Sequence, residues 1–332
     1  MKKVLILGSN SFTAGYIINK LLSYDDISIV GLSRNDEYIT ALSPYKNINF
    51  KKNRFKFYKL DINQDIELIY KLINKFKPSH VINYAAQGEV RNSWKFPLDW
   101  YQTNIVSNIK IIEFLKDKSF LKKYISVSTP EVYGSNLKAI TEKQLYFPTT
   151  PYAISKLTTD LHLHALFNMN KFPVVFTRSS NVYGPYQQLY RIIPKTIINL
   201  KLEKKITLHG GGKSKRSFIH ASDVANFTFK AMKIGKPGEV YHCSPQDNPI
   251  SIKNIVKIIC NKMNKSYSSS VIDIDENFGQ DQCYFLNSNK AKKILNWKPN
   301  FSLDSGIDST ITWVEKNWDI LKKQNHEYLH QK

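Results

Sequence analysis

The residues of this chain that could do chemistry begin with a tyrosine and a lysine four positions apart. Tyr152 and Lys156 lie in the segment ProTyrAlaIleSerLys, residues 151–156. On a helix, side chains at i and i+4 share one face and neighbour each other. The lysine ammonium favours phenolate over phenol, so we expect it to lower the tyrosine pKa from about 10 toward neutrality. Such a tyrosine can act as a general base on an alcohol.

Strands and helices that alternate along the first half must position this pair. The predicted strands are the apolar runs 4–8, 27–32, 55–61, 80–85, 124–128 and 173–178. The predicted helices are 12–22, 63–76, roughly 98–117, and one that starts at the tyrosine. This alternation predicts an α/β fold, a Rossmann-type doubly wound parallel sheet with a smaller C-terminal substrate-binding lobe. Ligands of such sheets bind beyond the carboxyl ends of the strands.

The turn after the first strand, GlySerAsnSerPheThrAlaGly at 8–15, opens a helix whose N-terminal amides suit a pyrophosphate. It is an imperfect glycine fingerprint, because Gly8 remains while Ser11 and Ala14 take the places of the later glycines. The alternative is a purely structural strand–turn–helix. Its place at the first strand of an α/β sheet favours a dinucleotide, whose nicotinamide ring would add to the effect of Lys156 on Tyr152.

The residues after the next strands bear on the choice of dinucleotide. Arg34, in LeuSerArgAsn at 32–35, suits a 2′-phosphate and hints at NADP, although a solvated loop arginine without any contact is the alternative. Asp61 follows the third strand and could accept from the adenine amino group. Small residues at 85–86, before Gln87, would let the cofactor pass. NAD and NADP therefore both stay open.

The second half changes its pattern from about residue 181. ValTyrGlyProTyr and GlyGlyGly are turn and loop signals, and helices are predicted near 251–263 and 307–318. We therefore predict a dinucleotide-binding domain over 1–180, with a return segment near 217–243. The substrate lobe is predicted over 181–216 and 244–332.

The composition bounds the remaining function classes. The chain has 332 residues and a formal net charge of +21. Its densest basic cluster, 51–56, is short and lies in a predicted loop, so we expect no nucleic-acid partner, and a basic surface also suits an anionic diphosphate. The three cysteines lack metal-like or redox spacing, so no metal site is expected. No apolar run approaches about 18 residues, so we expect a soluble cytoplasmic protein without a membrane segment.

Further segments recur in a characteristic order. They are AlaAlaGln (85–87), ThrAsn (103–104), SerThrProGluValTyrGly (128–134), ProTyrAlaIleSerLys (151–156), AsnValTyrGlyPro (181–185), ArgIleIlePro (191–194), ArgSerPheIleHis (216–220) and AsnTrpLysPro (296–299). In this order and spacing the chain resembles the extended short-chain dehydrogenase/reductases. Within them it is similar to the NAD(P)-dependent nucleotide-sugar epimerases and dehydratases, above all the dTDP-glucose and GDP-mannose 4,6-dehydratases.

The resemblance implies a catalytic set and a reaction. Thr129 would hydrogen-bond the sugar 4-hydroxyl, Tyr152 would remove its proton, and Lys156 would hold the ribose. Glu131 would remove the C5 proton once C4 is oxidised, and water would leave across C5 and C6. The cycle is redox-neutral, so a tightly held, recycled NAD or NADP is implied.

The resemblance also implies binding residues and an assembly. The candidate cofactor-binding residues are Gly8, Ser11, Phe12, Thr13, Ser33, Arg34, Asp61, Ile62, Ala85, Ala86, Gln87, Thr103, Tyr152 and Lys156. The candidate substrate-binding residues are Thr129, Asn181, Arg191, Ile192, His209 and Arg216, each of which could instead be a surface residue. Arginines match a diphosphate bidentately. The helices near 98–117 and 151–169 would form a homodimer interface, with burial inside the monomer as the alternative.

Other functions on the same scaffold stay open. Epimerases of the family generally lack a carboxylate at the position of Glu131, whereas dehydratases and UDP-glucuronate decarboxylases carry it. We therefore expect a lyase, with a 4-epimerase or a decarboxylase-like enzyme as the alternative. Pro130 replaces the aspartate that dTDP-glucose 4,6-dehydratases use to protonate the leaving hydroxyl, so Glu131 or water would have to do so. A non-catalytic dinucleotide sensor would commonly lose Tyr152 or Lys156.

Overall fold

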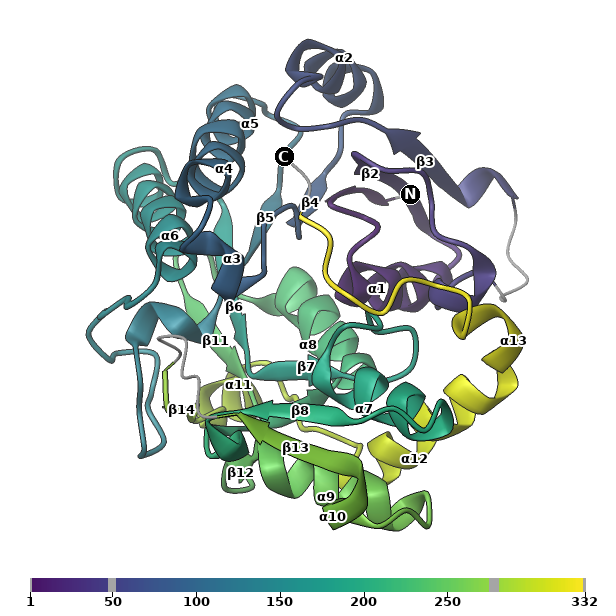
Figure 1. Ribbon diagram of the computed structural model, residues 1–332. Helices are drawn as coiled ribbons and strands as arrows, with labels where there is room; N and C mark the ends of the chain where they lie inside the picture. The colour runs from purple at the N-terminus through teal and green to yellow at the C-terminus, as the bar shows by residue number, and fades with distance from the viewer. Residues whose placement is uncertain (1, 47–51, 275–280, 331–332) are drawn as a thin grey trace.

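A seven-stranded parallel sheet forms the centre of the computed structural model, which describes residues 2–46, 52–274 and 281–330. Its strand order is β11-β6-β5-β4-β1-β2-β3. The strands are β1 Lys2–Leu7, β2 Ile27–Ser33, β3 Phe55–Lys59, β4 His80–Asn83, β5 Lys123–Val127, β6 Val174–Ser179 and β11 Val240–Cys243. The predicted α/β fold is confirmed (Figure 1). Sequence order reverses between β1 and β4, and such a switch point opens a crevice for ligands.

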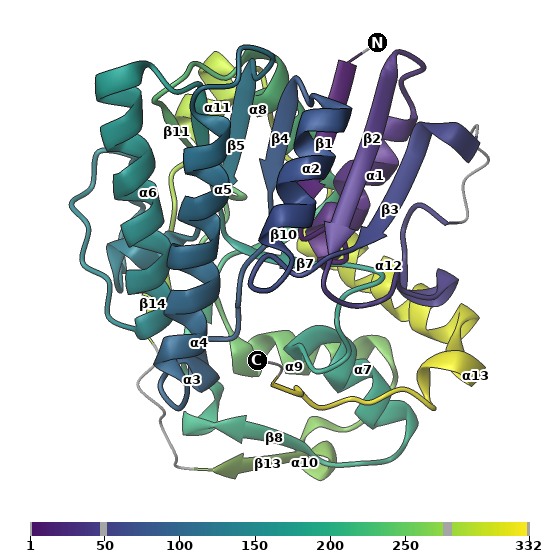
Figure 2. The ribbon, with the colours of Figure 1, turned by 90° about the horizontal axis from the view of Figure 1, so that it is seen from above.

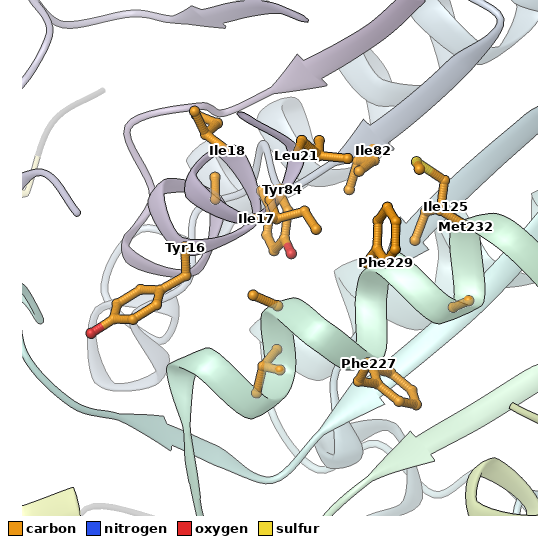
Figure 3. Packing of buried hydrophobic residues seen from close by; sticks show 14 of the residues in the cluster. Tyr16, Ile17, Ile18, Leu21, Ile82, Tyr84, Ile125, Phe227, Phe229 and Met232 are labelled. Atoms are coloured by element: carbon orange, nitrogen blue, oxygen red, sulfur yellow. The ribbon is translucent and has the colours of Figure 1, made fainter. Parts of the chain in front are cut away.

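Helices cover both faces of this sheet because its strands are apolar on both sides. Alternate residues of a strand point to opposite faces. Val4 and Ile6 of β1 pack with α1 (Phe12–Leu22) and α8 (Ala221–Ile234), whose interlocking side chains are shown in Figure 3. Leu5 and Leu7 pack on the other face, where the helices are α2 Ile66–Phe76, α5 Asn108–Leu115 and α6 Pro151–Asn170. Every residue from Val4 to Leu7 is fully buried.

The helix predicted at 98–117 is interrupted by a π-helical turn. It consists of α4 (Pro97–Tyr101), the π turn Gln102–Ser107, and α5, preceded by the short helix α3 (Val90–Ser93). A π turn adds a residue to the helical repeat, and such turns are frequent at functional sites. Here it turns Thr103 and Asn104 inward, where both are buried.

The remaining elements build a second, smaller core beyond the carboxyl ends of the sheet. Two-stranded parallel sheets pair β7 with β10 and β8 with β13, and β12-β9-β14 form a third small sheet. The strands are β7 Asn181–Tyr183, β8 Ile206–His209, β9 Lys215–Arg216, β10 Phe218–His220, β12 Ile250–Ser251, β13 Val271–Ile274 and β14 Cys283–Tyr284. The helices are α7 Ile192–Lys201, α9 Ile252–Lys262, α10 Tyr267–Ser270, α11 Asn289–Ile294, α12 Leu303–Lys316 and α13 Trp318–Leu321. Short 3₁₀ turns occupy Thr40–Leu42, Lys52–Arg54, Pro130–Tyr133 and Gly210–Gly212.

The chain passes between the two parts more than once. Between β10 and β12 it returns to the sheet, where α8 covers one face and β11 pairs in parallel with β6. The C-terminal tail, residues 322–330, then runs from α13 back along the carboxyl ends of the strands (Figure 2). The division at 1–180 with a return segment near 217–243 stays a proposal. In the part of the chain that the structure describes, no helix is both long and apolar enough to cross a membrane.

The basic cluster 51–56 is not the plain loop that the sequence predicts. Lys51 lies outside the described residues, a 3₁₀ turn covers 52–54, and β3 begins at Phe55. Arg54 is buried, and its guanidinium donates to the Leu22 carbonyl at 3.0 Å and to the Ile27 carbonyl at 3.2 Å. It also bonds the Tyr24 carbonyl. Arg54 therefore satisfies the carbonyls at the end of α1 and joins that helix to the sheet.

We predict that Arg54→Met lowers the free energy of unfolding by about 3 kcal/mol, because it leaves several buried carbonyls without a donor. Urea denaturation followed by circular dichroism measures this change. The control is Lys56→Ala in the same cluster, where the lysine is exposed and we expect a change within about 0.5 kcal/mol. Equal effects of the two substitutions would contradict a structural role for Arg54.

Candidate active site

A single cavity of about 770 Å³ opens at the carboxyl ends of the central strands. It brings together all four predicted catalytic residues and every predicted cofactor-binding residue. Of the predicted substrate-binding residues, it includes Thr129, Asn181, Arg191 and Ile192. His209 and Arg216 are not in its lining. Segments that are far apart in the sequence therefore meet around one space.

Gly8 turns the chain from β1 into α1. Its φ is +73°, and a Cβ at this position would lie 2.6 Å from the Ala85 amide nitrogen. Only glycine tolerates both conditions. Ser11 caps α1, because its hydroxyl oxygen accepts from the Ala14 amide at 3.2 Å. The result is a turn without a side chain at Gly8, next to the positive end of a helix, which fits a pyrophosphate.

Asn10 ties the end of β2 to this turn. Its amide donates to the Ser33 hydroxyl at 3.0 Å, and its side chain donates to the carbonyls of residues 35–36 at 3.2 and 2.9 Å. Ser33 and Arg34 thereby line the cavity beside the glycine turn, and Asp61 lines it from the end of β3. Asp61 thus contributes a carboxylate and Arg34 a guanidinium to the part of the cavity where the ribose of a dinucleotide and its substituents would lie.

Asn104 in the π turn joins the loop after β4 to the helix that carries the tyrosine. Its side-chain oxygen accepts from the Gln87 amide at 2.8 Å, and its side-chain nitrogen donates to the Gln87 carbonyl at 3.0 Å and to the Ser155 hydroxyl at 2.9 Å. Its carbonyl accepts from the Thr159 hydroxyl at 2.6 Å. The sequence indicated Thr103 at this place and missed the positioning role of Asn104.

Glu131 projects from the 3₁₀ turn that follows β5. Pro130 begins this turn, and the Thr129 hydroxyl accepts from the Glu131 amide at 3.3 Å. Within the described residues, Glu131 Oε2 is buried without a hydrogen-bond partner. Burial raises the pKa of Glu131 to about 7, with the Arg216 guanidinium opposing the rise and Asp281 adding to it. A carboxyl with this pKa can take up and release a proton at neutral pH.

Tyr152 and Lys156 lie one turn apart at the start of α6, beside Thr129 and Glu131. Burial raises the pKa of Tyr152 above its ordinary value, the Glu131 charge adds to this, and the Thr129 hydroxyl opposes it. The Lys156 ammonium donates to the Val127 carbonyl at 2.9 Å, and burial lowers its own pKa. In the chain alone the Tyr152 pKa is therefore raised and not lowered. The predicted lowering also involves a positively charged nicotinamide ring, so it stays a prediction for the loaded protein.

A buried ion pair lies next to the residues that flank Thr129 and Lys156. Arg178 and Asp160 are both buried, and the guanidinium donates to Asp160 Oδ2 at 2.8 Å. The same oxygen accepts from the Ser128 hydroxyl at 2.6 Å, which fixes the residue before Thr129. Asp160 lies one turn beyond Lys156 on α6, and its charge opposes the effect of burial on the Lys156 pKa. The pair therefore fixes the end of β5 through Ser128, and the Asp160 charge favours the protonated form of Lys156.

The Arg216 side chain bonds backbone carbonyls near Glu131 and is not among the residues that line the cavity. Its guanidinium donates to the carbonyls of Lys215 at 2.7 Å, Gln282 at 3.2 Å and Asp281 at 2.8 Å, and it lies 4.5 Å from the centre of the Tyr284 ring. It affects the cavity through its charge, since it lowers the Glu131 pKa. His209 lies exposed at the end of β8.

The cavity includes residues that the sequence did not indicate. Among them are Gln187, Tyr190, Tyr328 and Leu329. Tyr190 precedes the predicted Arg191, so its position could have been found from its neighbour. Tyr328 and Leu329 come from the C-terminal tail, and no local pattern marks them. Only the path of the chain brings them to the cavity.

Comparisons with known proteins agree with this arrangement. The sequence profile of the GDP-mannose 4,6-dehydratase family matches residues 5–310. A curated mouse protein, dTDP-D-glucose 4,6-dehydratase, is 32% identical over 323 residues, which cover 96% of this chain and 90% of the relative. A trifunctional UDP-glucose 4,6-dehydratase of Arabidopsis thaliana is 31% identical; the match covers 95% of this chain and 47% of that longer protein.

Solved structures are similar over nearly the whole length. The dTDP-glucose 4,6-dehydratase of Bacillus anthracis in complex with NAD is 26% identical, with a TM-score of 0.86 and coverage of 96% of this chain and 98% of that one. The UDP-glucuronic acid 4-epimerase of Bacillus cereus, in complex with UDP-glucuronic acid and NAD, is 24% identical, with a TM-score of 0.85 and coverage of 95% and 99%. At that identity the second similarity shows the fold alone.

The raised pKa of Glu131 predicts a pH-dependent stability. Between about pH 4.5 and 7 the native carboxyl keeps a proton that the unfolded chain has released. The free energy of unfolding therefore loses up to about 3 kcal/mol from this group as the pH rises through that window. Glu131→Gln removes this loss, so its stability relative to wild type should rise between pH 4.5 and pH 8.

Urea denaturation of both proteins at several pH values measures the difference. Glu67→Gln is the control, because Glu67 is an exposed carboxylate on α2. A stability difference between wild type and Glu131→Gln that stays constant over this range would contradict the raised pKa.

Proposed function

We infer that this chain, which belongs to the GDP-mannose 4,6-dehydratase family, is a nucleotide-sugar 4,6-dehydratase. It converts a nucleoside-diphosphate hexose into the 4-keto-6-deoxy sugar nucleotide with loss of water. The observation that carries this function is the buried Glu131 carboxyl beside Thr129 and Tyr152 in one cavity. In a dehydrogenase or an epimerase, Tyr152 would be the only side chain that has to accept a proton from the sugar. An elimination across C5 and C6 also needs a second base, which removes the C5 proton.

The cavity fits a nicotinamide dinucleotide. The Gly8 turn and the start of α1 would hold its pyrophosphate, Lys156 its nicotinamide ribose, and Ser33, Arg34 and Asp61 its adenosine end. When bound, the nicotinamide would supply reversible hydride chemistry for the oxidation at C4 and the reduction at C6. The dehydratase of Bacillus anthracis was solved with NAD. Arg34 also suits the 2′-phosphate of NADP. The mass of the dinucleotide that copurifies with the chain distinguishes the two.

Tyr152 and Thr129 would activate the sugar 4-hydroxyl. Thr129 orients the hydroxyl, and Tyr152 takes its proton as C4 is oxidised. Burial and the Glu131 charge keep Tyr152 a phenol in the chain alone. Positive charge near the ring favours the phenolate. The tyrosine would therefore become a base when the positively charged, oxidised nicotinamide ring is bound beside it.

Glu131 would carry out the elimination. The C5 hydrogen becomes acidic once C4 is a carbonyl, and the carboxylate takes that proton. Pro130 has no proton to give, so we propose that the protonated Glu131 delivers the same proton to O6 as the C6–O bond breaks. The departing group is then water and Glu131 is a carboxylate again. It would take up a proton from solvent and deliver it to C5 when C6 is reduced. The pKa of Glu131, about 7, suits these transfers.

The substrate diphosphate would bind opposite the sheet. Arg191 stands before α7, and Ile192 begins that helix; both line the cavity together with Asn181. An arginine next to a helix N-terminus suits an anionic diphosphate. Arg216 and His209 remain proposed substrate-binding residues. For Arg216 we favour an indirect effect through the Glu131 charge.

Incubation with a panel of nucleotide hexoses tests this function. We expect loss of 18 mass units and a 4-keto product from at least one of them. A product of unchanged mass with inverted C4 would favour the epimerase, and loss of carbon dioxide from a glucuronate would favour a decarboxylase. Tyr152→Phe should lower kcat by at least about 100-fold, because proton transfer by a positioned base contributes about that much.

Glu131→Gln separates oxidation from elimination. We expect it to form the dehydrated product at least about 100-fold more slowly, and to lose exchange of the C5 hydrogen with deuterated water. It should still allow oxidation at C4, seen as dinucleotide absorbance near 340 nm. Unaltered C5 exchange would contradict the assignment of Glu131 as the base.

We further propose that the chain forms a homodimer through α5 and α6, which lie side by side (Figure 2). Ile154 and Leu161 are seven positions apart on α6 and are 41% and 50% exposed, and Val106 in the π turn before α5 is 42% exposed. Apolar side chains gathered on one face mark interaction sites. All three cysteines are free and buried, which suits the proposed cytoplasmic location.

Light scattering coupled to size-exclusion chromatography tests the dimer. We expect the wild type to elute at twice the chain mass of 38.5 kDa. Leu161→Glu should convert it to a monomer, because a charge in an apolar interface is costly. Leu68→Glu on α2 is the control, since this exposed leucine lies outside the proposed face. A wild type that is monomeric at micromolar concentration would contradict the proposal.

A further inference from the structure

The C-terminal tail crosses the cavity instead of ending on the lobe that precedes it. After α13 ends at Leu321, residues 322–330 run along the carboxyl ends of the sheet strands (Figures 1 and 2). Nine residues in extended form reach about 30 Å. We call this segment the strap.

The strap is fixed to the body of the protein at its centre and at its far end. The His326 ring, at the centre of the strap, bonds the Leu321 carbonyl at the end of α13 at 2.9 Å. The next residue, Glu327, pairs with Lys195 of α7 at 2.7 and 2.9 Å. At its far end His330 Nε2 lies 2.7 Å from Asp99 Oδ2 of α4.

The contact at the far end is also an aromatic one. The His330 ring stacks on Phe96, with centroids 4.6 Å apart, and on Trp100, at 5.3 Å. Only 14% of the His330 side chain is exposed. This end therefore docks on the sheet domain, while the other end belongs to the smaller lobe. The strap joins the two parts across the cavity mouth.

Between these anchors the strap presents two side chains to the cavity. Tyr328 and Leu329 both line it. Leu329 is 68% exposed, so a ligand in the cavity could cover part of this apolar side chain. The Tyr328 ring packs edge-on against Tyr190, with centroids 5.2 Å apart.

The charges around Tyr328 come from both ends of the cavity. Its neighbours include Arg34 at the end of β2, and Glu89 and Arg191 on the substrate side. Burial raises the pKa of Tyr328 to about 12, so its hydroxyl stays a hydrogen-bond donor at neutral pH. A donor that feels the charge of two guanidinium groups suits a phosphate oxygen.

We propose that the strap is part of the dinucleotide site: Tyr328 and Leu329 cover the bound cofactor and retain it between turnovers. This inference rests on the proposed function, because it needs a dinucleotide in the cavity. It adds a binding role for a segment that local sequence patterns do not mark. A redox-neutral cycle has no need to exchange its cofactor, so slow release carries no cost in rate.

The test compares the rate of dinucleotide release from four full-length or shortened proteins. These are the wild type, Tyr328→Ala, a chain that ends at Gln324, and Lys323→Ala. Each is loaded with reduced dinucleotide, and the loss of its fluorescence is followed after excess oxidised dinucleotide is added. Lys323→Ala is the matched control, because this exposed lysine precedes the strap contacts and does not line the cavity.

We expect release at least about tenfold faster from Tyr328→Ala and from the shortened chain, equivalent to about 1.4 kcal/mol, and no change for Lys323→Ala. Thermal unfolding of Tyr328→Ala shows whether it is folded. Tyr328→Phe separates the hydroxyl from the ring: release at an intermediate rate supports hydrogen bonding to the ligand.

Unchanged release from both altered proteins would overturn the inference while leaving the proposed function intact. A rise in the KM for the nucleotide sugar with unchanged dinucleotide release would also overturn it, because the strap would then serve the substrate. Failure of the wild type to bind any dinucleotide would overturn the proposed function and this inference together.

Discussion

Partial burial of ionisable groups at the carboxyl edge of the sheet is the constraint on which the site depends. Burial raises the Glu131 pKa, raises that of Tyr152 and lowers that of Lys156. All three shifts favour the neutral form of the group. At neutral pH the Glu131 carboxyl is therefore close to half ionised, and charge brought by a ligand would change the ionisation of all three groups. Charged ligands supply that charge, so chemistry is coupled to binding.

Such burial is possible only because a rigid polar framework surrounds the site. The Asp160–Arg178 pair fixes Ser128 at the end of β5, and Asn104 fastens the loop at Gln87 to α6. A buried ion pair adds little stability compared with well-packed apolar residues, but breaking it is costly. We therefore interpret this pair as a device that positions Thr129 and Lys156.

The two parts of the chain contribute different chemistry to one cavity. The sheet supplies the turn at Gly8 and the reactive groups at the ends of its strands. The smaller lobe supplies Arg191 and, through the strap, Tyr328. A ligand that contacts both parts would hold them together, and the anchored strap adds a contact that persists without one.

The sequence by itself determined the alternation of elements, the glycine turn and the Tyr152–Lys156 pair, because these depend on local periodicity and spacing. Only the tertiary structure decided the ionisation of Tyr152 and Glu131, the burial of Arg54 and the backbone contacts of Arg216. It also decided that Tyr328 reaches the cavity. Desolvation and partner choice arise from segments that are distant in the chain, so no local pattern encodes them. The fold was thus largely predictable, whereas the electrostatics of the site were not.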